Sequence, residues 1–143
     1  MNEAGSIVGC EGESPAPSVP HTVSRVYVDE AVFPFRGALM AHMFSRDLAA
    51  LHGIAEQLGV RRWFQDPTTM KVSFPHYDIT AAQREKALAL GAVAVNKYQM
   101  LAMVRHITGR AHEQIAVPAM AAALEWLRRE LTDETKGPAP GPS

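Results

Sequence analysis

Short apolar runs alternate with amphipathic stretches along the middle of the chain. The β-branched and aromatic run Val26-Tyr27-Val28 stops at the charged pair Asp29-Glu30, as a buried strand does. We expect further strands at residues 62–65, which Asp66-Pro67 ends, and at the apolar run 92–95. Strands that alternate with helices predict an α/β fold, here a small single-domain sandwich with a three- or four-stranded sheet.

Two stretches carry the start and stop signals of core helices. The first follows the N-cap residues Ser45 and Asp47 and ends at Gly59. The second opens with Thr-x-x-Gln at residues 80–83, the form of a capping box, and closes on Gly91. These signals fix two helix boundaries before any packing is considered.

Residues 39–44, between the first predicted strand and the first core helix, can be read in two ways. As a strand, residues 39–44 place Met40, His42 and Phe44 on one face; as a helix, they start an apolar stripe that continues through the first core helix. The N-cap residues favour the strand. If residues 39–44 pair antiparallel with the first strand, Asp29 and Gln65 lie at opposite edges of the sheet. They share an edge only if residues 39–44 are helical.

The two ends of the chain differ in composition from the middle. Residues 1–24 and 134–143 are rich in Gly and Pro and poor in apolar side chains, so we expect a disordered leader and tail around a core of residues 25–96. Residues 97–133 predict a helical extension: one helix ends near Gly109, and another begins at Pro118. The apolar stripe of the second helix predicts packing on the sheet or on another subunit. It consists of Met120, Leu124, Leu127 and Leu131.

Length and charge limit the classes of function. A chain of 143 residues predicts one domain, and a formal net charge of -1 disfavours nucleic acid and anionic membranes as partners. No apolar stretch reaches the ~18 residues that span a bilayer. The single cysteine, Cys10, cannot form an internal disulfide, which predicts a cytoplasmic location.

The tripeptide His76-Tyr77-Asp78 is the main candidate for chemistry. It lies directly before the second core helix, behind a loop rich in turn residues, where binding groups collect. We expect His76 to act as a general base, a metal ligand or a phosphate contact, with Asp78 orienting it or a substrate hydroxyl and Tyr77 binding ligand. The structural alternative is that Asp78 holds the start of the helix and Tyr77 packs in the core.

Other candidate ligand-binding residues lie around the same elements. His42 is either a binding residue or a hydrogen-bonded core histidine, and Asp29 either meets a ligand at the end of the first strand or makes a turn. Arg36 and Lys71 could bind phosphate or carboxylate, or remain solvated loop charges. Gln65 is included because it ends a predicted strand.

Two histidines and a carboxylate can hold zinc or non-haem iron. Yet His42, His76 and either Asp29 or Asp78 show no compact spacing such as His-x-x-x-His, so the sequence predicts no metal ligands. It also contains no Gly-rich phosphate loop and no Gly-x-Ser-x-Gly motif. No cofactor follows from the residues.

Several motifs occur in a fixed order over residues 26–95. They are Val-Tyr-Val-Asp, Pro34-Phe35, His42-Met43, Leu51-His52 with Ala55, Gly59 with Arg62-Trp63-Phe64-Gln65, His76-Tyr77-Asp78 and Gly91-Ala92. This order resembles a small bacterial and phage family, domain of unknown function 4031. The resemblance implies a domain and no activity.

These observations lead to one main functional hypothesis and two alternatives. The main one is a pocket around residues 76–78 that binds, and could hydrolyse, an anionic or nucleotide-like small molecule. The first alternative is a non-enzymatic module that forms a homodimer through its C-terminal helices. The second is a metal-dependent hydrolase or nuclease.

Overall fold

The computed structural model describes residues 24–110 and 117–135 of the chain. Residues 24–130 form one compact unit, and residues 131–135 continue the last helix beyond it. The predicted leader and tail lie outside the described residues, apart from residue 24 and residues 134–135.

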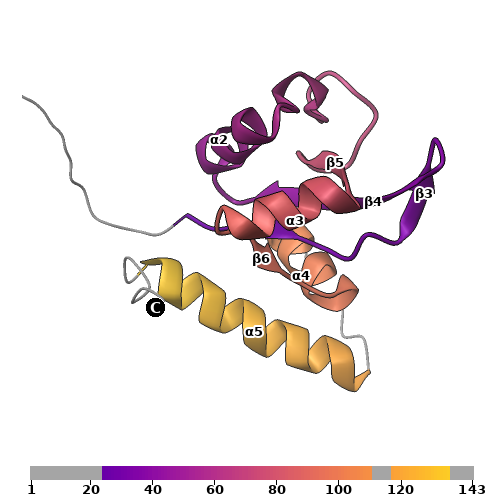
Figure 1. The fold of residues 1–143 in the computed structure, drawn as a ribbon. Coiled ribbons are helices and arrows are strands. Elements are labelled where there is room, and N and C mark those ends of the chain that lie inside the picture. Colours follow the sequence, from indigo (N-terminus) through magenta and orange to yellow (C-terminus); the bar gives the residue numbers. More distant parts are fainter. Residues whose placement is uncertain (1–23, 111–116, 136–143) are drawn as a thin grey trace, which may run out of the picture. The chain divides into compact units, whose positions relative to one another are not determined.

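The compact unit is a mixed α/β domain with a five-stranded sheet, which confirms the predicted class but exceeds the three or four strands expected (Figure 1). The strands are β2 (Val26–Val28), β3 (Phe33–Phe35), β4 (Ala38–Ser45), β5 (Tyr77–Thr80) and β6 (Val93–Ala94). The helices are α2 (Leu48–Leu58), the short 3-10 helix η2 (Arg61–Trp63), α3 (Ala81–Ala89), α4 (Lys97–Ile107) and α5 (Pro118–Thr135).

Strand β4 is the centre of the sheet. It pairs antiparallel with β2 and β3 along one side and with β5 along the other, and β6 extends the sheet by pairing parallel with β2. Met43, for example, is opposite Val28 on β2 and opposite Tyr77 on β5. The strand reading of residues 39–44 is therefore confirmed.

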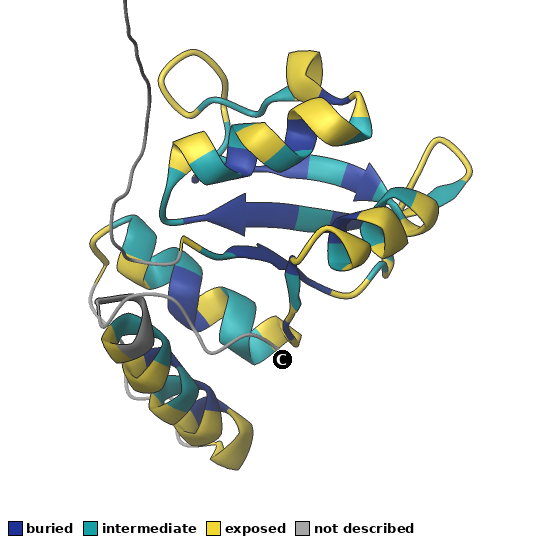
Figure 2. Cartoon of the chain, turned by 60° about the vertical axis from the view of Figure 1, so that its left-hand side comes forward, coloured by how far each residue is buried: buried dark blue, intermediate teal, exposed yellow. Residues whose placement is uncertain are grey.

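The two faces of the sheet pack against different helices (Figure 2). On one face, alternate residues of β2, β4 and β5 meet α2 and α3 in a closed core. This core contains Val26, Val28, Ala41, Met43, Leu51, Ala55, Tyr77, Ile79 and Ala87. On the opposite face Tyr27 contacts Phe44 and meets Trp126 of α5 edge-on, with ring centroids 5.7 Å apart in both pairs.

The predicted helix boundaries agree with the structure. The Asp47 carboxylate accepts from the first backbone N–H groups of α2, and Gly59 ends that helix in a left-handed conformation with φ 77°. The capping box of Thr80 and Gln83 is formed in both directions at the start of α3. Asn96 and Gln99 make a second capping box, which we did not predict.

Two local predictions were wrong, and one strand was missed. Residues 62–65 do not form a strand: residues 61–63 make η2, and Gln65 makes only an isolated bridge to His76. The supposed loop before α3 contains β5, a strand too short to stand out in the sequence. Strand β3 was missed because Pro34 occupies its middle, which an edge strand tolerates.

The C-terminal helices were predicted at the right places. Helix α4 ends before Gly109, and α5 begins at Pro118 but runs to Thr135, two residues past the expected end. Met120 and Leu127 are buried within the single chain, as is Ala123, so much of the apolar stripe is already covered. None of the described helices is long and apolar enough to cross a membrane.

A two-residue turn joins β3 to β4. Phe35 pairs with Ala38, and the two residues between them, Arg36 and Gly37, have φ of 53° and 79°. Two positive φ values are the mark of a type I′ turn, which favours Asn-Gly. Arg36 therefore holds a backbone conformation that costs an ordinary residue about 1 kcal/mol.

We expect Arg36→Asn to raise the free energy of unfolding by about 0.5 kcal/mol. The gain of about 1 kcal/mol from a residue suited to the turn exceeds the ~0.5 kcal/mol of the exposed contact between the Arg36 guanidinium and the Phe35 ring. Urea denaturation measures the change. Gly37→Ala should do the opposite and lower stability by about 1 kcal/mol. A marked loss of stability in Arg36→Asn would contradict the turn assignment.

Candidate functional site

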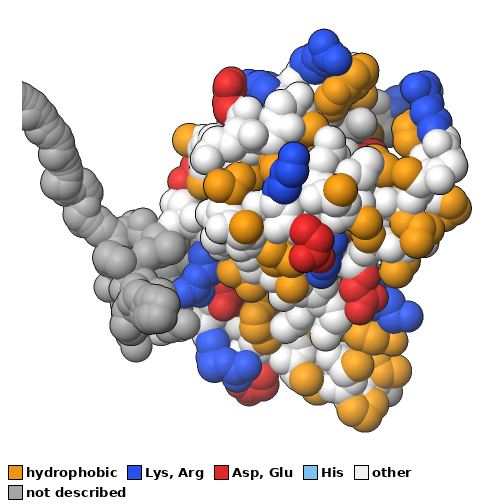
Figure 3. All heavy atoms as spheres, viewed as in Figure 1, with side chains coloured by type: hydrophobic (Ala, Val, Ile, Leu, Met, Phe, Trp, Pro, Cys, Tyr) orange, Lys and Arg blue, Asp and Glu red, His pale blue; other side chains and the backbone are white. Residues whose placement is uncertain are grey.

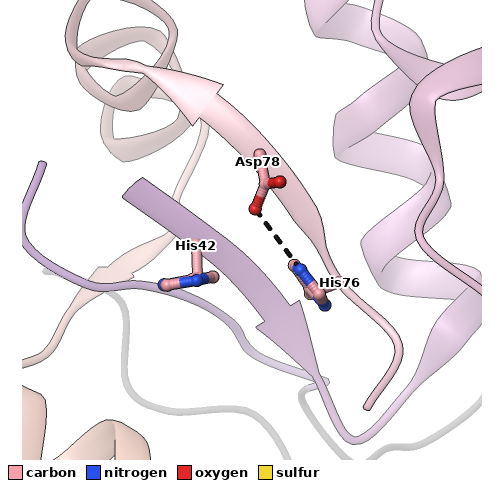
Figure 4. A group of neighbouring side chains, drawn as sticks. All are labelled: His42, His76 and Asp78. Atoms are coloured by element: carbon pink, nitrogen blue, oxygen red, sulfur yellow. Dashed lines mark ion pairs between the residues drawn. The ribbon is translucent and has the colours of Figure 1, made fainter. Parts of the chain in front are cut away.

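The pairing of β4 with β5 brings His42, His76 and Asp78 together (Figure 4). His42 on β4 is directly opposite Asp78 on β5. His76 lies two residues before Asp78, so the two side chains point to the same face of the extended segment. Gln65 holds the backbone of His76 in place through two backbone hydrogen bonds of 2.9 and 3.3 Å.

The three side chains form a cluster with metal-ligand composition. One ligand atom from each lies within 4.8 Å of the other two, and His76 Nε2 is 3.3 Å from Asp78 Oδ1. Ligands bonded to zinc at ~2.1 Å are about 3.4 Å apart in a tetrahedral site. The widest separation would therefore have to close by about 1.4 Å to complete the geometry around an ion.

Asp29 fixes the orientation of His42. Its Oδ2 is 2.8 Å from His42 Nδ1, and its Oδ1 accepts from the His42 backbone N–H at 2.6 Å. A carboxylate accepts hydrogen bonds, so in the neutral imidazole Nδ1 carries the proton and Nε2 keeps its lone pair. A carboxylate behind the imidazole is the usual support of a metal-binding histidine.

A backbone carbonyl fixes the orientation of His76 in the same way, by accepting a hydrogen bond from its Nδ1. His76 Nδ1 is 2.8 Å from the carbonyl oxygen of Phe74, which can only accept, so neutral His76 also has its lone pair on Nε2. That lone pair faces Asp78 Oδ1, a buried oxygen with no hydrogen-bond donor. Two acceptors 3.3 Å apart repel each other unless a hydrogen-bond donor or a cation lies beside them.

Aromatic rings surround the two imidazoles. Phe33 stacks on His42 at 4.7 Å between ring centroids, and Phe74 stacks on His76 at 4.4 Å. His76 is only 7% exposed, whereas His42 and Asp78 are half-buried. The cluster therefore combines aromatic neighbours with partial exposure of His42 and Asp78.

Tyr77 points away from this cluster. It lies on the core face of the sheet, where it is fully buried, and its hydroxyl is 2.7 Å from His52 Nδ1. Burial raises the pKa of Tyr77 and lowers the pKa of His52, so both groups are neutral near pH 7. The pair fits the structural alternative for Tyr77, a ring packed in the core.

The remaining candidates divide between a pocket and the open surface. Asp78, Gln65 and Arg36 line a pocket of about 420 Å³ that also includes Trp63. Lys71 is exposed and lies outside both this pocket and the His-Asp cluster. Asp29 lies on the β2 side of β4, whereas Gln65 bonds to His76 beyond the other side.

Sequence reasoning missed several supporting residues. Phe33 and Phe74 were unremarkable apolar positions, and Arg84 gave no signal, although its Nε donates to the Asp29 carbonyl oxygen at 2.6 Å. The sequence signal for the cluster itself was the spacing of His76 and Asp78 by two residues, because this spacing places both side chains on one face of a strand.

Charges of both signs are interspersed on the face of the molecule in Figure 3. Lys and Arg side chains there alternate with Asp and Glu side chains among apolar ones. This described face does not gather the basic charge that a phosphate backbone attracts.

Comparison with known proteins identifies the family. The family described as "Protein of unknown function (DUF4031)" matches residues 26–107, more than half of the chain, and this span includes every residue of the His-Asp cluster. No curated protein and no solved structure matches the chain. The chain therefore belongs to the DUF4031 family.

Proposed function

We propose that this protein is a metal-dependent hydrolase that binds one zinc ion through His42, His76 and Asp78. The observation that carries the proposal is that one ring nitrogen of each histidine and a carboxylate oxygen of Asp78 lie within 4.8 Å of one another, and that the buried Asp78 Oδ1 has no hydrogen-bond donor. Two histidines and one carboxylate are the protein ligands of several hydrolytic zinc sites.

The supports of both histidines favour a metal over a simple ion pair. Asp29 and the Phe74 carbonyl each bind an Nδ1–H, so both Nε2 atoms are left available. A protonated His76 paired with Asp78 would explain one contact but would not explain why His42 is held in the same tautomer. A divalent cation accounts for all three groups.

Three protein ligands leave a fourth position on zinc for water. A zinc ion held by His42, His76 and Asp78 would supply a bound water of lowered pKa, about 7, as the nucleophile for hydrolysis. The neighbouring pocket, whose wall includes Asp78, is where the substrate would lie.

This proposal selects one of the roles predicted for His76. We expected a base, a metal ligand or a phosphate contact, and the available Nε2 supports the metal ligand. The small anionic substrate of the main sequence hypothesis is retained as a partner. A homodimer is not part of the proposal, because α5 buries Met120, Ala123 and Leu127 within its own chain.

We expect the metal-free protein to bind one equivalent of Zn²⁺, measured by isothermal titration calorimetry and by elemental analysis after dialysis. Asp78→Asn and His76→Ala should each lose most of this affinity, because each removes a ligand. Glu30→Gln removes a nearby exposed carboxylate and should leave binding unchanged. Unaltered binding in Asp78→Asn, with native circular dichroism, would overturn the site.

Asp29→Asn should weaken zinc binding about 10- to 100-fold at the same stoichiometry. An amide NH₂ beside His42 Nδ1 would donate to it and move the imidazole proton to Nε2, which removes the ligand lone pair. Calorimetry of Asp29→Asn against Glu30→Gln measures the effect. Equal affinity in the two variants would contradict the positioning role of Asp29.

An open coordination position separates a hydrolytic site from a structural one. We expect the visible absorption bands of the cobalt-substituted protein to shift when azide or acetohydroxamate is added, because either ligand replaces the bound water. The zinc form should also hydrolyse p-nitrophenyl esters faster than His76→Ala does. Cobalt bands that do not respond to either ligand would identify a closed, structural site and overturn the hydrolase proposal.

A further inference from the structure

The pocket beside the His-Asp cluster carries features of a particular kind of ligand. It is lined by Phe35 and Arg36 from the β3–β4 turn and by Trp63 and Gln65 from the segment after α2. Asp78 lies in its wall, so the pocket adjoins the proposed zinc position. Its volume of about 420 Å³ is within the range of small-molecule sites, about 300–1,000 Å³.

The aromatic residues of the pocket are unusually exposed. Trp63 is 58% and Phe35 53% exposed, although both are large and apolar. Arginine side chains lie over both rings: the Arg36 guanidinium carbon is 5.1 Å from the Phe35 centroid, and that of Arg62 is 4.9 Å from the Trp63 centroid. Exposed rings next to guanidinium groups suit a ligand that combines a flat ring with negative charge.

The charge of the pocket also favours an anion. Arg36 is its one basic and Asp78 its one acidic lining residue among the described residues. Zinc bound at Asp78 would exceed the charge of that carboxylate, so the loaded pocket would be positive at both positions. Gln65 and Gln83 add neutral amide groups to the lining, which can bind the polar edge of a ring.

The backbone of Arg36 gives an independent reason to assign it a role. Arg36 occupies a turn position that favours Asn or Gly, with φ 53°. Conformations of this kind persist where the side chain contributes something that the turn itself does not need. The contact over Phe35 holds the guanidinium at the pocket.

We propose that this pocket binds small planar organic anions, with the ring against Trp63 and Phe35 and the carboxylate or phosphate group on Arg36. The assignment names the substrate class of the proposed hydrolase and in that respect rests on the proposed function. The contacts that define the class come from residues that do not bind the metal, so they can be tested separately.

Matched ligands test the two halves of the assignment. Adenosine 5′-monophosphate and benzoate carry a ring and a charge, adenosine and benzamide carry only the ring, and phosphate and acetate carry only the charge. Binding is followed by calorimetry and by tryptophan fluorescence in Trp126→Phe, which leaves Trp63 as the reporter. We expect at least one ring-bearing anion to bind tenfold or more tightly than both of its matched analogues.

Variants test which residues cause the tighter binding of ring-bearing anions. Arg36→Asn, which suits the turn, should abolish the preference of ring-bearing anions over neutral rings, whereas Lys71→Ala, which removes an exposed cation outside the pocket, should retain it. Trp63→Leu should abolish the preference over acetate or phosphate. Equal binding of charged and neutral rings, or an unchanged preference in Arg36→Asn, would overturn the proposal.

Zinc binding and the preference for ring-bearing anions are measured separately, so the failure of this inference can be told from the failure of the proposed function. If the protein binds zinc but shows no preference for ring-bearing anions, the substrate class is wrong and the metal site stands. If zinc does not bind but Arg36→Asn still abolishes a measured preference, the hydrolase proposal fails and the pocket assignment stands. Phosphate binding alone, equal in the wild type and Arg36→Asn, would be adventitious and would count against the pocket.

Discussion

The antiparallel pairing of β4 with strands on both of its sides determines where nearly everything else in the domain lies. Its register sets His42 opposite Asp78 on β5 and beside Asp29 at the end of β2. A shift of one residue in either pairing would turn the side chains of one partner strand to the other face. The buried core against α2 and α3 resists such a shift, because it would move Met43 or Tyr77 from the core to the opposite face.

The same alternation that builds the core therefore also builds the candidate site. Tyr77 faces the helices while its neighbours His76 and Asp78 face the opposite side, so one short segment serves both packing and chemistry. The tautomers of the two histidines follow from this placement, since Asp29 and the Phe74 carbonyl take up the Nδ1 protons. Stability of the core and orientation of the cluster are consequently coupled through β4 and β5.

The pocket adjoins the cluster at Asp78. The β3–β4 turn brings Arg36 to its rim, and η2 brings Trp63, although the residues that form η2 were expected to be a strand. The 3-10 turn leaves Trp63 exposed next to the pocket. The departure from the sequence prediction thus occurs where the chain presents an aromatic side chain to a ligand.

The sequence by itself determined the α/β class and several helix ends, because caps and apolar periodicity act over a few neighbouring residues. It also indicated His76 and Asp78, since they lie directly before a capped helix start, where binding groups collect. Only the tertiary structure decided that His42 joins them, that Asp29 supports His42 and that Tyr77 belongs to the core. These relations depend on how β4 pairs with β2 and β5, and local spacing contains no information on those registers.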